Sequence, residues 1–454
     1  MVLRSLRPVL LAATAAFALA GCTSSDDFSD TLTSLNPFGA QEKHLPGTRK
    51  PVLPDQSPAQ LAKNKPVSVT GPRPAGNWGQ ASGPATNNPG HVALDGTGGN
   101  RIWATNAADV SSGSMLRGAP RVFARPVASD GRIFVYDPNG NVSAHSADGG
   151  GRLWKVSLRP AGRDDEPVAG GGVAAEGGRV YAATGYGTVV ALDATSGAKV
   201  WEQKIGEPAR GAPTVAQGKV FAVSQANVLY ALNAGDGVEA WTFKGVPEVG
   251  GLLSSVNPAV AGDRVVVPFS SGELVAVDIK TGKPVWSDGL ARASRNYAVT
   301  GLADIAASPV IDDGVVYATG VGSRTVALQL KSGNRIWEQA IGSAHTPVVS
   351  GNAVFVVDLD DNLIAFDRKS GEVLWSNKLP VTRTKKKRTN WAGPVLAGGS
   401  LWLVSNEGGL VAVNPANGQV VNTRDTGEPA MLAPVVASGK LIVLSGSGTL
   451  EAFN

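Results

Sequence analysis

The sequence contains a single cysteine and only four histidines among its 454 residues. One cysteine cannot form an intramolecular disulfide, and so few scattered cysteine and histidine side chains do not suit a zinc site. Charged residues are also scarce, at 17% against a usual ~25%, and the formal net charge is only +4. Beyond one run near the N-terminus, no apolar stretch approaches the ~18 residues of a membrane-spanning helix. These absences exclude a disulfide scaffold and argue against a metalloenzyme built on cysteine or histidine.

Glycine, by contrast, is abundant, with 57 residues, or about 12.6% of the chain, against a typical ~7%. Glycine supplies the positive φ angles that tight turns require, so the chain is expected to contain many turns. This argues against a helical bundle. No strict three-residue period runs through the glycines, which excludes collagen. The hydrophobic share of 43% is enough to bury a large core.

The first 22 residues have the layout of a lipoprotein signal peptide. Arg4 and Arg7 form a basic start, an apolar run follows, and it ends in Leu19-Ala20-Gly21-Cys22. This ending resembles the lipobox of bacterial lipoproteins, which implies cleavage before Cys22 and a lipid on that cysteine. Thr23 follows where an Asp commonly retains such proteins in the inner membrane, so the resemblance favours the outer membrane. The alternative is an ordinary secretory signal (residues 1–21) with a chance cysteine.

The next stretch, residues 22–75, shows no hydrophobic periodicity and is rich in Pro, Ser, Lys, Gly and Asn. We expect a flexible tether here, and a coil of about 54 residues would span roughly 40 Å. The globular domain is then expected over residues 76–454.

This domain is built from a repeat. Its units begin with Pro and a Val-rich strand, continue through Gly and a second apolar strand, and end in Gly-x-x-x-Trp, with the tryptophans 38 to 51 residues apart. A period of about 40–50 residues made of short strands is typical of a β-propeller. Asn100 to Trp103 has the same sequence as Asn334 to Trp337, so residues around 100–107 are expected to supply the missing fourth strand of the last unit. The fold class is therefore all-β: an eight-bladed β-propeller of four-stranded antiparallel blades, closed by an N-terminal strand.

Seven of the ten tryptophans fall at one position of the repeat, where an eighth unit has Asn; these residues are Trp103, Trp154, Trp201, Trp241, Trp286, Trp337, Trp375 and Asn422. We expect the tryptophans to pack between neighbouring blades. The alternative is that they stack on a ligand.

The core of the repeat, as in Ala191-Leu192-Asp193 to Trp201 and Ala276-Val277-Asp278 to Trp286, resembles the quinoprotein-type (PQQ-like) propeller repeat. Two families share that repeat: quinone-dependent dehydrogenases and BamB, a lipoprotein of the outer-membrane barrel assembly machine. The resemblance to BamB extends over the whole chain, from lipobox and tether to eight blades without large insertions. The dehydrogenases typically carry a vicinal Cys-Cys disulfide and a calcium cage, and the single cysteine here is used elsewhere. Asp193, Asp278 and Asp367 sit in repeat turns, where a turn-capping role is expected.

No phosphate-binding loop, dinucleotide fingerprint, zinc-protease motif or nucleophile elbow is present. We therefore expect no catalytic residue, cofactor or metal. The alternative of a periplasmic quinoprotein dehydrogenase or ligand-binding propeller stays open, as does a propeller that binds cell-wall polysaccharide.

The resemblance to BamB implies a lipoprotein scaffold, anchored in the outer membrane and facing the periplasm, that binds the barrel-forming subunit BamA and assists insertion of outer-membrane proteins. Other assembly lipoproteins and nascent outer-membrane proteins are the further partners implied, with the chain as a monomer within a hetero-complex. In the family, loops on one face make the contact. Leu252 matches a family Leu, Leu253 stands where an Arg is expected, Asp304 matches the first Asp of an Asp-x-Asp pair, and Ile305 follows it. The alternative for the two leucines is packing beneath their loop.

One strongly basic run stands out: Arg383, Lys385, Lys386, Lys387 and Arg388 place five positive charges in six residues. Cleavage of the signal removes Arg4 and Arg7 and leaves 39 basic against 37 acidic residues, so without this run the mature chain would be −3. The basic character is local. Nucleic acid is implausible outside the cytoplasm, and we expect contact with anionic lipid headgroups or with an acidic partner. A solvated loop is the alternative.

Overall fold

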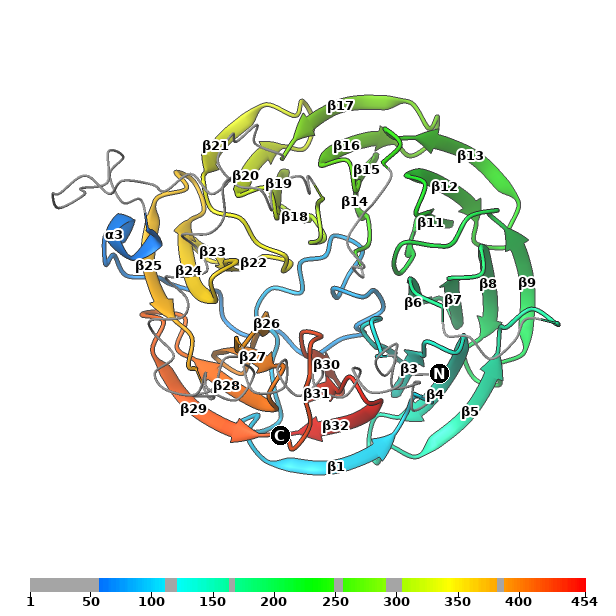
Figure 1. Cartoon of the computed structure of the whole chain (residues 1–454), viewed down its shortest axis with the longest axis horizontal. Coiled ribbons are helices and arrows are strands. Elements are labelled where there is room, and N and C mark those ends of the chain that lie inside the picture. Colours follow the sequence, from blue (N-terminus) through cyan, green and yellow to red (C-terminus); the bar gives the residue numbers. More distant parts are fainter. Residues whose placement is uncertain (1–56, 111–120, 163–167, 249–255, 291–303, 382–387) are drawn as a thin grey trace, which may run out of the picture. The chain divides into compact units, whose positions relative to one another are not determined.

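Eight small β-sheets arranged in a ring make up the described part of the chain. A computed structural model describes residues 57–110, 121–162, 168–248, 256–290, 304–381 and 388–454. These residues form eight four-stranded antiparallel sheets and one short helix, α3 (Pro58–Leu61). Figure 1 shows the sheets as blades around a central axis; in seven of them the first strand lies near the centre and the last on the rim, and in the eighth β1 lies on the rim. The predicted eight-bladed β-propeller is confirmed.

The blades are numbered here along the chain, and each is given from its innermost to its outermost strand. Blades 1 to 4 are β2–β5 (Val127–Ser129, Arg132–Tyr136, Asn141–Ser146, Arg152–Ser157), β6–β9 (Gly171–Glu176, Arg179–Thr184, Thr188–Asp193, Lys199–Lys204), β10–β13 (Thr214–Ala216, Lys219–Val223, Val228–Asn233, Glu239–Lys244) and β14–β17 (Ala259–Ala261, Arg264–Pro268, Glu273–Asp278, Pro284–Gly289). Blades 5 to 8 are β18–β21 (Val310–Asp312, Val315–Gly320, Arg324–Gln329, Arg335–Gln339), β22–β25 (Val348–Ser350, Ala353–Val357, Asn362–Asp367, Val373–Lys378), β26–β29 (Trp391–Ala397, Ser400–Ser405, Gly409–Val413, Val420–Asp425) and β30–β32 (Val435–Ala437, Lys440–Leu444, Thr449–Phe453) with β1 (Arg101–Asn106) outermost.

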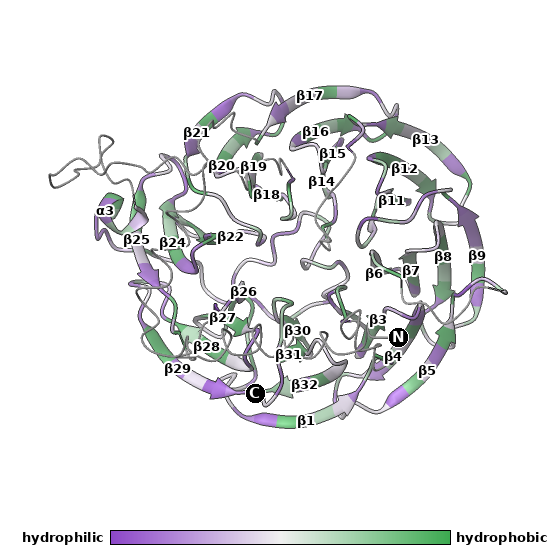
Figure 2. Cartoon of the chain, in the orientation of Figure 1, coloured by the Kyte–Doolittle hydropathy of each residue, from purple (hydrophilic) through white to green (hydrophobic). Residues whose placement is uncertain are grey.

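Hydrophobicity falls from the middle of each blade to its rim. The two middle strands are Val-, Ala- and Leu-rich and almost wholly buried, whereas the outermost strands alternate exposed and half-buried residues. Figure 2 shows this as green inner strands and largely purple and white outer ones. Middle strands are apolar on both faces because each blade is covered on both sides by its neighbours. The outermost strands are polar because they meet solvent.

Ring closure uses the first strand of the domain. β1 pairs antiparallel with β32, with Trp103 opposite Ala452 and Asn106 opposite Thr449. The last residue adds two backbone hydrogen bonds, since Asn100 N–H donates to the Asn454 carbonyl at 3.0 Å and Asn454 N–H to the Asn100 carbonyl at 2.9 Å. The predicted closing strand is therefore confirmed, and joining the two chain ends within one sheet removes the edges that an open ring would expose.

The repeated tryptophans join each blade to the next. The Trp241 Nε1–H of blade 3 donates to the Ile279 carbonyl of blade 4 at 2.9 Å, and a Cβ added to Gly282 in that blade's hairpin turn would lie 2.7 Å from the same ring. The same donor geometry, at 2.8 to 3.1 Å, recurs at Trp154, Trp201, Trp286, Trp337 and Trp375. The prediction of packing between blades is confirmed. Glycine is required in these turns both by positive φ and by the tryptophan beneath it.

In blade 7, Asn422 stands where the other blades have a tryptophan. The next blade, blade 8, has no hairpin joining its two outermost strands, β32 and β1.

A segment before β1 crosses the centre of the ring. We call residues 68–95 the central segment, and Figure 1 shows it running among the innermost strands. It hydrogen-bonds to the innermost strands of seven blades and to the turn after β30, through Ala128, Ala175, Val215, Val260, Ile311, Ser350, Leu396 and Gly439. Innermost strands would otherwise leave buried backbone groups unpaired at the axis.

These contacts move the boundary of the predicted tether. Residues 57–75 were expected to be part of it, but Lys63, Lys65 and Ser68 already bond to blade 6. The remainder of the tether, the signal peptide and Cys22 lie outside the described residues. Within the described ranges, no helix has the length and apolar character needed to cross a membrane.

Candidate functional site

The residues predicted to bind the barrel-forming subunit belong to interblade connections, the segments that join the outermost strand of one blade to the innermost strand of the next. Leu252 and Leu253 lie in the connection between blades 3 and 4, outside the described residues. Asp304 and Ile305 end the connection between blades 4 and 5, and they are buried, at 1% and 0% exposed. Neither side chain is therefore displayed on a surface loop, and any part that they take in binding must be indirect.

Asp304 is held by Arg210, a residue that no motif in the sequence marks. It forms an ion pair with Arg210, whose side chain is 4% exposed. Arg210 also donates to the Pro268 carbonyl at the end of β15 and to the Ile305 carbonyl, both at 2.9 Å. Because Arg210 precedes blade 3, Pro268 lies in blade 4 and Asp304 precedes blade 5, one guanidinium ties three consecutive blades together.

Close packing of the backbone reinforces this junction. A Cβ added to Gly211 would lie 2.2 Å from the Val256 carbonyl oxygen, so the connections before blades 3 and 4 touch there. Burial lowers the pKa of Arg210, and the Asp304 charge opposes that shift. One feature of the sequence could have pointed to Arg210: it is a lone charged residue among small ones, in Ala209-Arg210-Gly211-Ala212, just before a first-strand proline.

Arg388 is the only member of the predicted basic contact that the structure describes; Arg383, Lys385, Lys386 and Lys387 lie outside the described residues. Its Nε donates to Asp361 at 3.0 Å, and its Nη2 donates to the Leu359 carbonyl. Asp361 in turn accepts from the Trp391 N–H at 3.1 Å. Arg388 therefore anchors the end of its loop to blade 6, and its charge is already partly matched by a carboxylate.

The outermost strands share a β-bulge at the residue before the tryptophan, or before Asn422 in blade 7. In blade 5, for example, Ala327 lies opposite Trp337 and Leu328 opposite Arg335, so that Ile336 is the extra residue. The same shift recurs in all eight blades. Six of the bulge residues are large, apolar and 41% to 58% exposed: Ile102, Leu153, Val200, Val285, Ile336 and Val421.

In blade 6 the chain covers its own bulge. Leu374, the equivalent residue, is only 2% exposed and packs with Val67 in one hydrophobic cluster. Lys63 N–H donates to the Val373 carbonyl at 2.9 Å and Lys65 N–H to the Leu374 carbonyl at 3.2 Å. An extended segment thus docks on the outer edge of a blade through two backbone hydrogen bonds and one apolar contact.

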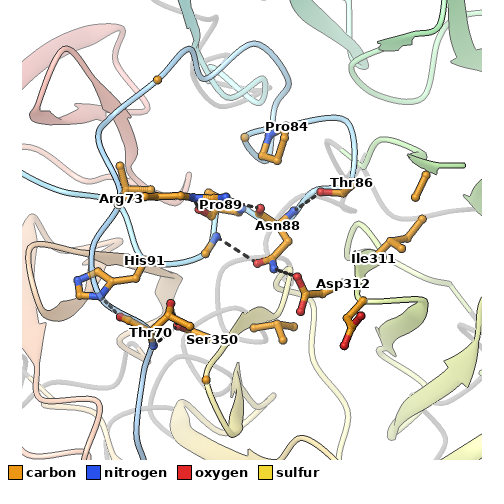
Figure 3. A pocket seen from close by; sticks show the side chains of 18 of the residues that line it. Thr70, Arg73, Pro84, Thr86, Asn88, Pro89, His91, Ile311, Asp312 and Ser350 are labelled. Carbon is orange, nitrogen blue, oxygen red and sulfur yellow. Dashed lines mark hydrogen bonds between the residues drawn. The ribbon is translucent and has the colours of Figure 1, made fainter.

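A cavity of about 690 Å³ lies between the central segment and the turns of blades 5 and 6 (Figure 3). Its polar groups are engaged with one another. Asn88 donates to Asp312 at 2.8 Å, and Arg368 forms an ion pair with the same carboxylate. His91 Nε2 accepts from the Gly399 N–H at 2.8 Å, so Nδ1 carries the proton and donates to the Thr70 carbonyl at 2.6 Å. These pairings stabilise the central segment.

The repeat aspartates cap turns, as expected. Asp193 accepts from the Thr195 and Ser196 N–H groups at 3.0 and 2.8 Å, and the Ser196 hydroxyl and amide hold the pKa of this carboxylate below its ordinary value. Asp278 and Asp367 make the corresponding bonds. Among the described residues, no three His, Cys, Asp or Glu side chains are grouped so as to hold a metal ion.

Solved structures share this fold. BamB from Moraxella catarrhalis superposes with a TM-score of 0.64 at 19% identity, covering 78% of this chain and 99% of that one. The quinohemoprotein alcohol dehydrogenase from Comamonas testosteroni gives a TM-score of 0.62 at 17% identity, over 83% of this chain and 80% of that one. At such identities both likenesses show the propeller fold alone.

Sequence comparisons separate the two families. Residues 138–377, more than half of the chain, match the sequence profile described as outer membrane protein assembly factor BamB. The protein of that name from Yersinia pestis is 31% identical over 78% of this chain and 88% of its own length, and that from Escherichia coli K12 is 30% identical over 77% and 89%. These relatives are assembly factors rather than enzymes. The chain, with its lipobox-like N-terminus and eight PQQ-like blades, belongs to the family of the outer membrane protein assembly factor BamB.

Proposed function

We propose that the protein is a lipid-anchored scaffold of the outer-membrane β-barrel assembly machinery, which binds the barrel-forming BamA-type subunit and assists insertion of outer-membrane proteins. The observation that carries this proposal is the match to BamB over more than three quarters of the chain. Attachment through a lipid on Cys22 would keep the propeller on the periplasmic side of the outer membrane. The chain would act as one copy within a complex that includes other assembly lipoproteins.

For the BamA-type subunit we propose a contact at the interblade connections before blades 4 and 5, with Leu252 and Leu253 as apolar anchors. Asp304 and Ile305 would act as positioning residues. The buried Arg210–Asp304 ion pair supports this assignment, because it holds the connections before blades 3 and 5 in register across blade 4.

The test is co-purification of the barrel-forming subunit with the full-length lipoprotein from solubilised envelope. Leu252→Asp with Leu253→Asp should reduce recovery of that subunit at least tenfold. Met431→Asp is the matched control, since Met431 is 45% exposed in another interblade connection, between blades 7 and 8, and its variant should retain recovery. Undiminished recovery with the double variant would refute the contact site. Absence of the subunit from the wild-type sample would refute the function.

We propose further that the basic run reaches anionic lipid headgroups. The described chain begins at Ser57, just before α3, which packs against β25, and Val381, the last described residue before the basic run, follows β25 in the chain. Each basic residue near an anionic surface contributes about 1 kcal/mol. A lipid on Cys22 and a basic patch would act together, because an acyl chain combined with a polybasic segment anchors a protein more stably than either signal alone.

Flotation with vesicles tests this second contact on protein that carries Cys22→Ser and no lipid. Lys385→Gln, Lys386→Gln and Lys387→Gln together should abolish binding to anionic vesicles. The charge-matched control is Lys280→Gln, Lys283→Gln and Lys331→Gln, three exposed lysines on blades 4 and 5, which should leave binding intact. Equal loss in both triple variants would assign the effect to net charge alone and overturn the proposal.

For nascent outer-membrane proteins we propose docking on the bulges of the outermost strands. Residues 63–67 provide the internal precedent, since they occupy the bulge of blade 6 with backbone hydrogen bonds and cover Leu374. An extended, alternating segment of a client can make the same contacts on another blade. Val285→Asp with Ile336→Asp should lower crosslinking of an unfolded barrel protein to blades 4 and 5. Met431→Asp, at a 45% exposed position in the connection between blades 7 and 8 and away from any bulge, should not, and equal effects would contradict the assignment.

A further inference from the structure

Arg125 is a cation near the axis of the ring that lacks a counter-ion among the described residues. It directly precedes Pro126 and β2, and its side chain is partly buried. The one hydrogen bond that it makes there runs from Nη1 to the Ser82 hydroxyl of the central segment, at 3.4 Å, which is long for such a bond. Burial lowers the pKa of Arg125 to about 10, and no carboxylate opposes the shift. The described protein atoms therefore remove part of the water around this charge without neutralising it.

The groups around Ser82 are neutral and already bonded to one another. The Ser82 hydroxyl donates to Asn257 Oδ1 at 3.4 Å, and the Ser308 hydroxyl donates to the same oxygen at 2.9 Å. Ser308 N–H donates to the Thr346 hydroxyl at 3.3 Å, and Asn257 Nδ2 donates to Asn87 at 2.7 Å. These side chains are at most 9% exposed and come from the central segment and from the connections before blades 4, 5 and 6. Hydroxyl and amide groups surround the axis here.

His345 adds an imidazole but no charge. It immediately precedes Thr346, and burial, assisted by the positive charge of Arg125, lowers the pKa of His345 to about 4. At neutral pH its ring can donate one hydrogen bond without competing for a counter-ion. The buried carboxylate of the neighbouring connection, Asp304, is committed to Arg210. The guanidinium of Arg125 is thus the uncompensated charge of this cluster.

A desolvated charge without a partner is costly, and a planar guanidinium matches the two oxygens of a carboxylate or phosphate. We propose that Arg125, with the Ser82 hydroxyl and the His345 imidazole, forms an anion-binding site on the propeller axis that takes a small carboxylate or phosphate ion. Four residues of this cluster each lie two positions before an innermost strand: Arg125, Asn257, Ser308 and Thr346. The site therefore lies where the interblade connections reach the innermost strands, whereas the 690 Å³ cavity is lined by turns that follow innermost strands, at residues 312–314 and 350–351.

Thermal unfolding and calorimetric titration of the full mature lipoprotein in detergent test the site. At constant ionic strength, replacing chloride by acetate or by inorganic phosphate should raise the unfolding midpoint in a saturable way. The two anions given separately distinguish carboxylate from phosphate as the preferred ligand. Arg125→Gln should abolish the response to both and weaken calorimetric binding at least tenfold. No saturable response in the wild type would overturn the proposal.

Two further variants test whether the anion response depends on the position and on the planar guanidinium of Arg125. Arg121→Gln is the matched control, because Arg121 lies four residues earlier in the same connection, is exposed, and among the described residues donates only to the Met431 sulfur; its variant should respond as the wild type does. Arg125→Lys keeps the charge but loses the planar fork, so anion affinity should fall several-fold while the fold is preserved. A response in Arg125→Lys and Arg125→Gln equal to that of the wild type would assign the anion effect to another part of the surface and refute the site.

Discussion

Arg210 and Asp304 form an ion pair in which neither side chain is more than 4% exposed, between connections that precede blades 3 and 5. The pair also spans blade 4, because the same guanidinium bonds the Pro268 carbonyl. Within the repeat, backbone pairing acts inside a blade and tryptophan packing acts between adjacent blades. This ion pair adds a bond across three blades, next to the segments proposed to meet the barrel-forming subunit.

Asp304→Asn should destabilise the fold strongly. It leaves Arg210 buried with no carboxylate, and breaking one side of a buried pair costs about 3–5 kcal/mol. Denaturant unfolding of the lipid-free protein measures the change. Arg210→Met combined with Asp304→Leu removes both charges and should recover at least half of the loss. A cost below about 1 kcal/mol for the single variant would show that Arg210 finds another partner.

Gly282→Ala should destabilise more than Gly314→Ala. Both glycines have positive φ, 69° and 73°, so alanine costs about 1–2 kcal/mol at either site. At Gly282 the added Cβ would also lie 2.7 Å from the Trp241 ring, while nothing lies within 4 Å of a Cβ at Gly314. Overpacking adds about 1–3 kcal/mol at the first site alone. Equal unfolding free energies for the two variants would contradict the interlocking of turn and tryptophan.

Gln80→Met should destabilise the contact of the central segment with blade 3. The Gln80 amide accepts from the Val215 N–H and donates to the Val215 carbonyl, both at 3.1 Å. Methionine has similar length and leaves both buried backbone groups without partners, which costs about 1–3 kcal/mol for each. Gln203→Met, on the outermost strand of blade 2, is the control and should change stability by less than about 0.5 kcal/mol. Hydrogen exchange at the Val215 amide should accelerate only in the first variant.

His345 should make the fold sensitive to mild acid. Its folded-state pKa of about 4 lies below the ordinary 6.5, so the unfolded chain binds the proton more readily. The contribution of neutral His345 to the free energy of unfolding is fully present above pH 6.5. It is lost as the pH falls from 6.5 to 4, by about 3 kcal/mol in total. Subtracting the pH profile of His345→Gln from that of the wild type removes the contribution of the carboxylates. A flat difference across this range would contradict the burial of the ring.

The ring could be predicted because each of its determinants is local and repeated. Pro at the first strand, alternating apolar strands, Gly in the turns and Trp at a constant offset recur every 38 to 51 residues, and short strands with that period are typical of a propeller. Closure by β1 was predictable because Asn100 to Trp103 duplicates Asn334 to Trp337. The turn aspartates were also predictable, since an Asx turn needs only residues two and three positions away.

The candidate site was less accessible to sequence reasoning. Asp304 was recognised, but its partner Arg210 lies 94 residues away and has no spacing signature. Arg125 and His345 are brought near each other only because the ring places blades 1 and 6 around one axis. Burial of Asp304 likewise depends on three connections meeting, and residue type alone favours the surface for an aspartate.

By itself the sequence determined the repeat, the number of blades, the closing strand and the family, because these depend on local propensity and on residues that recur at regular spacing. Only the tertiary structure decided what occupies the centre and which charges are buried. Residues 68–95 look like loop in the sequence because they lack periodicity. In the ring they supply hydrogen-bond partners to innermost strands that would otherwise be unpaired at the axis, and that requirement exists only once all eight blades are assembled.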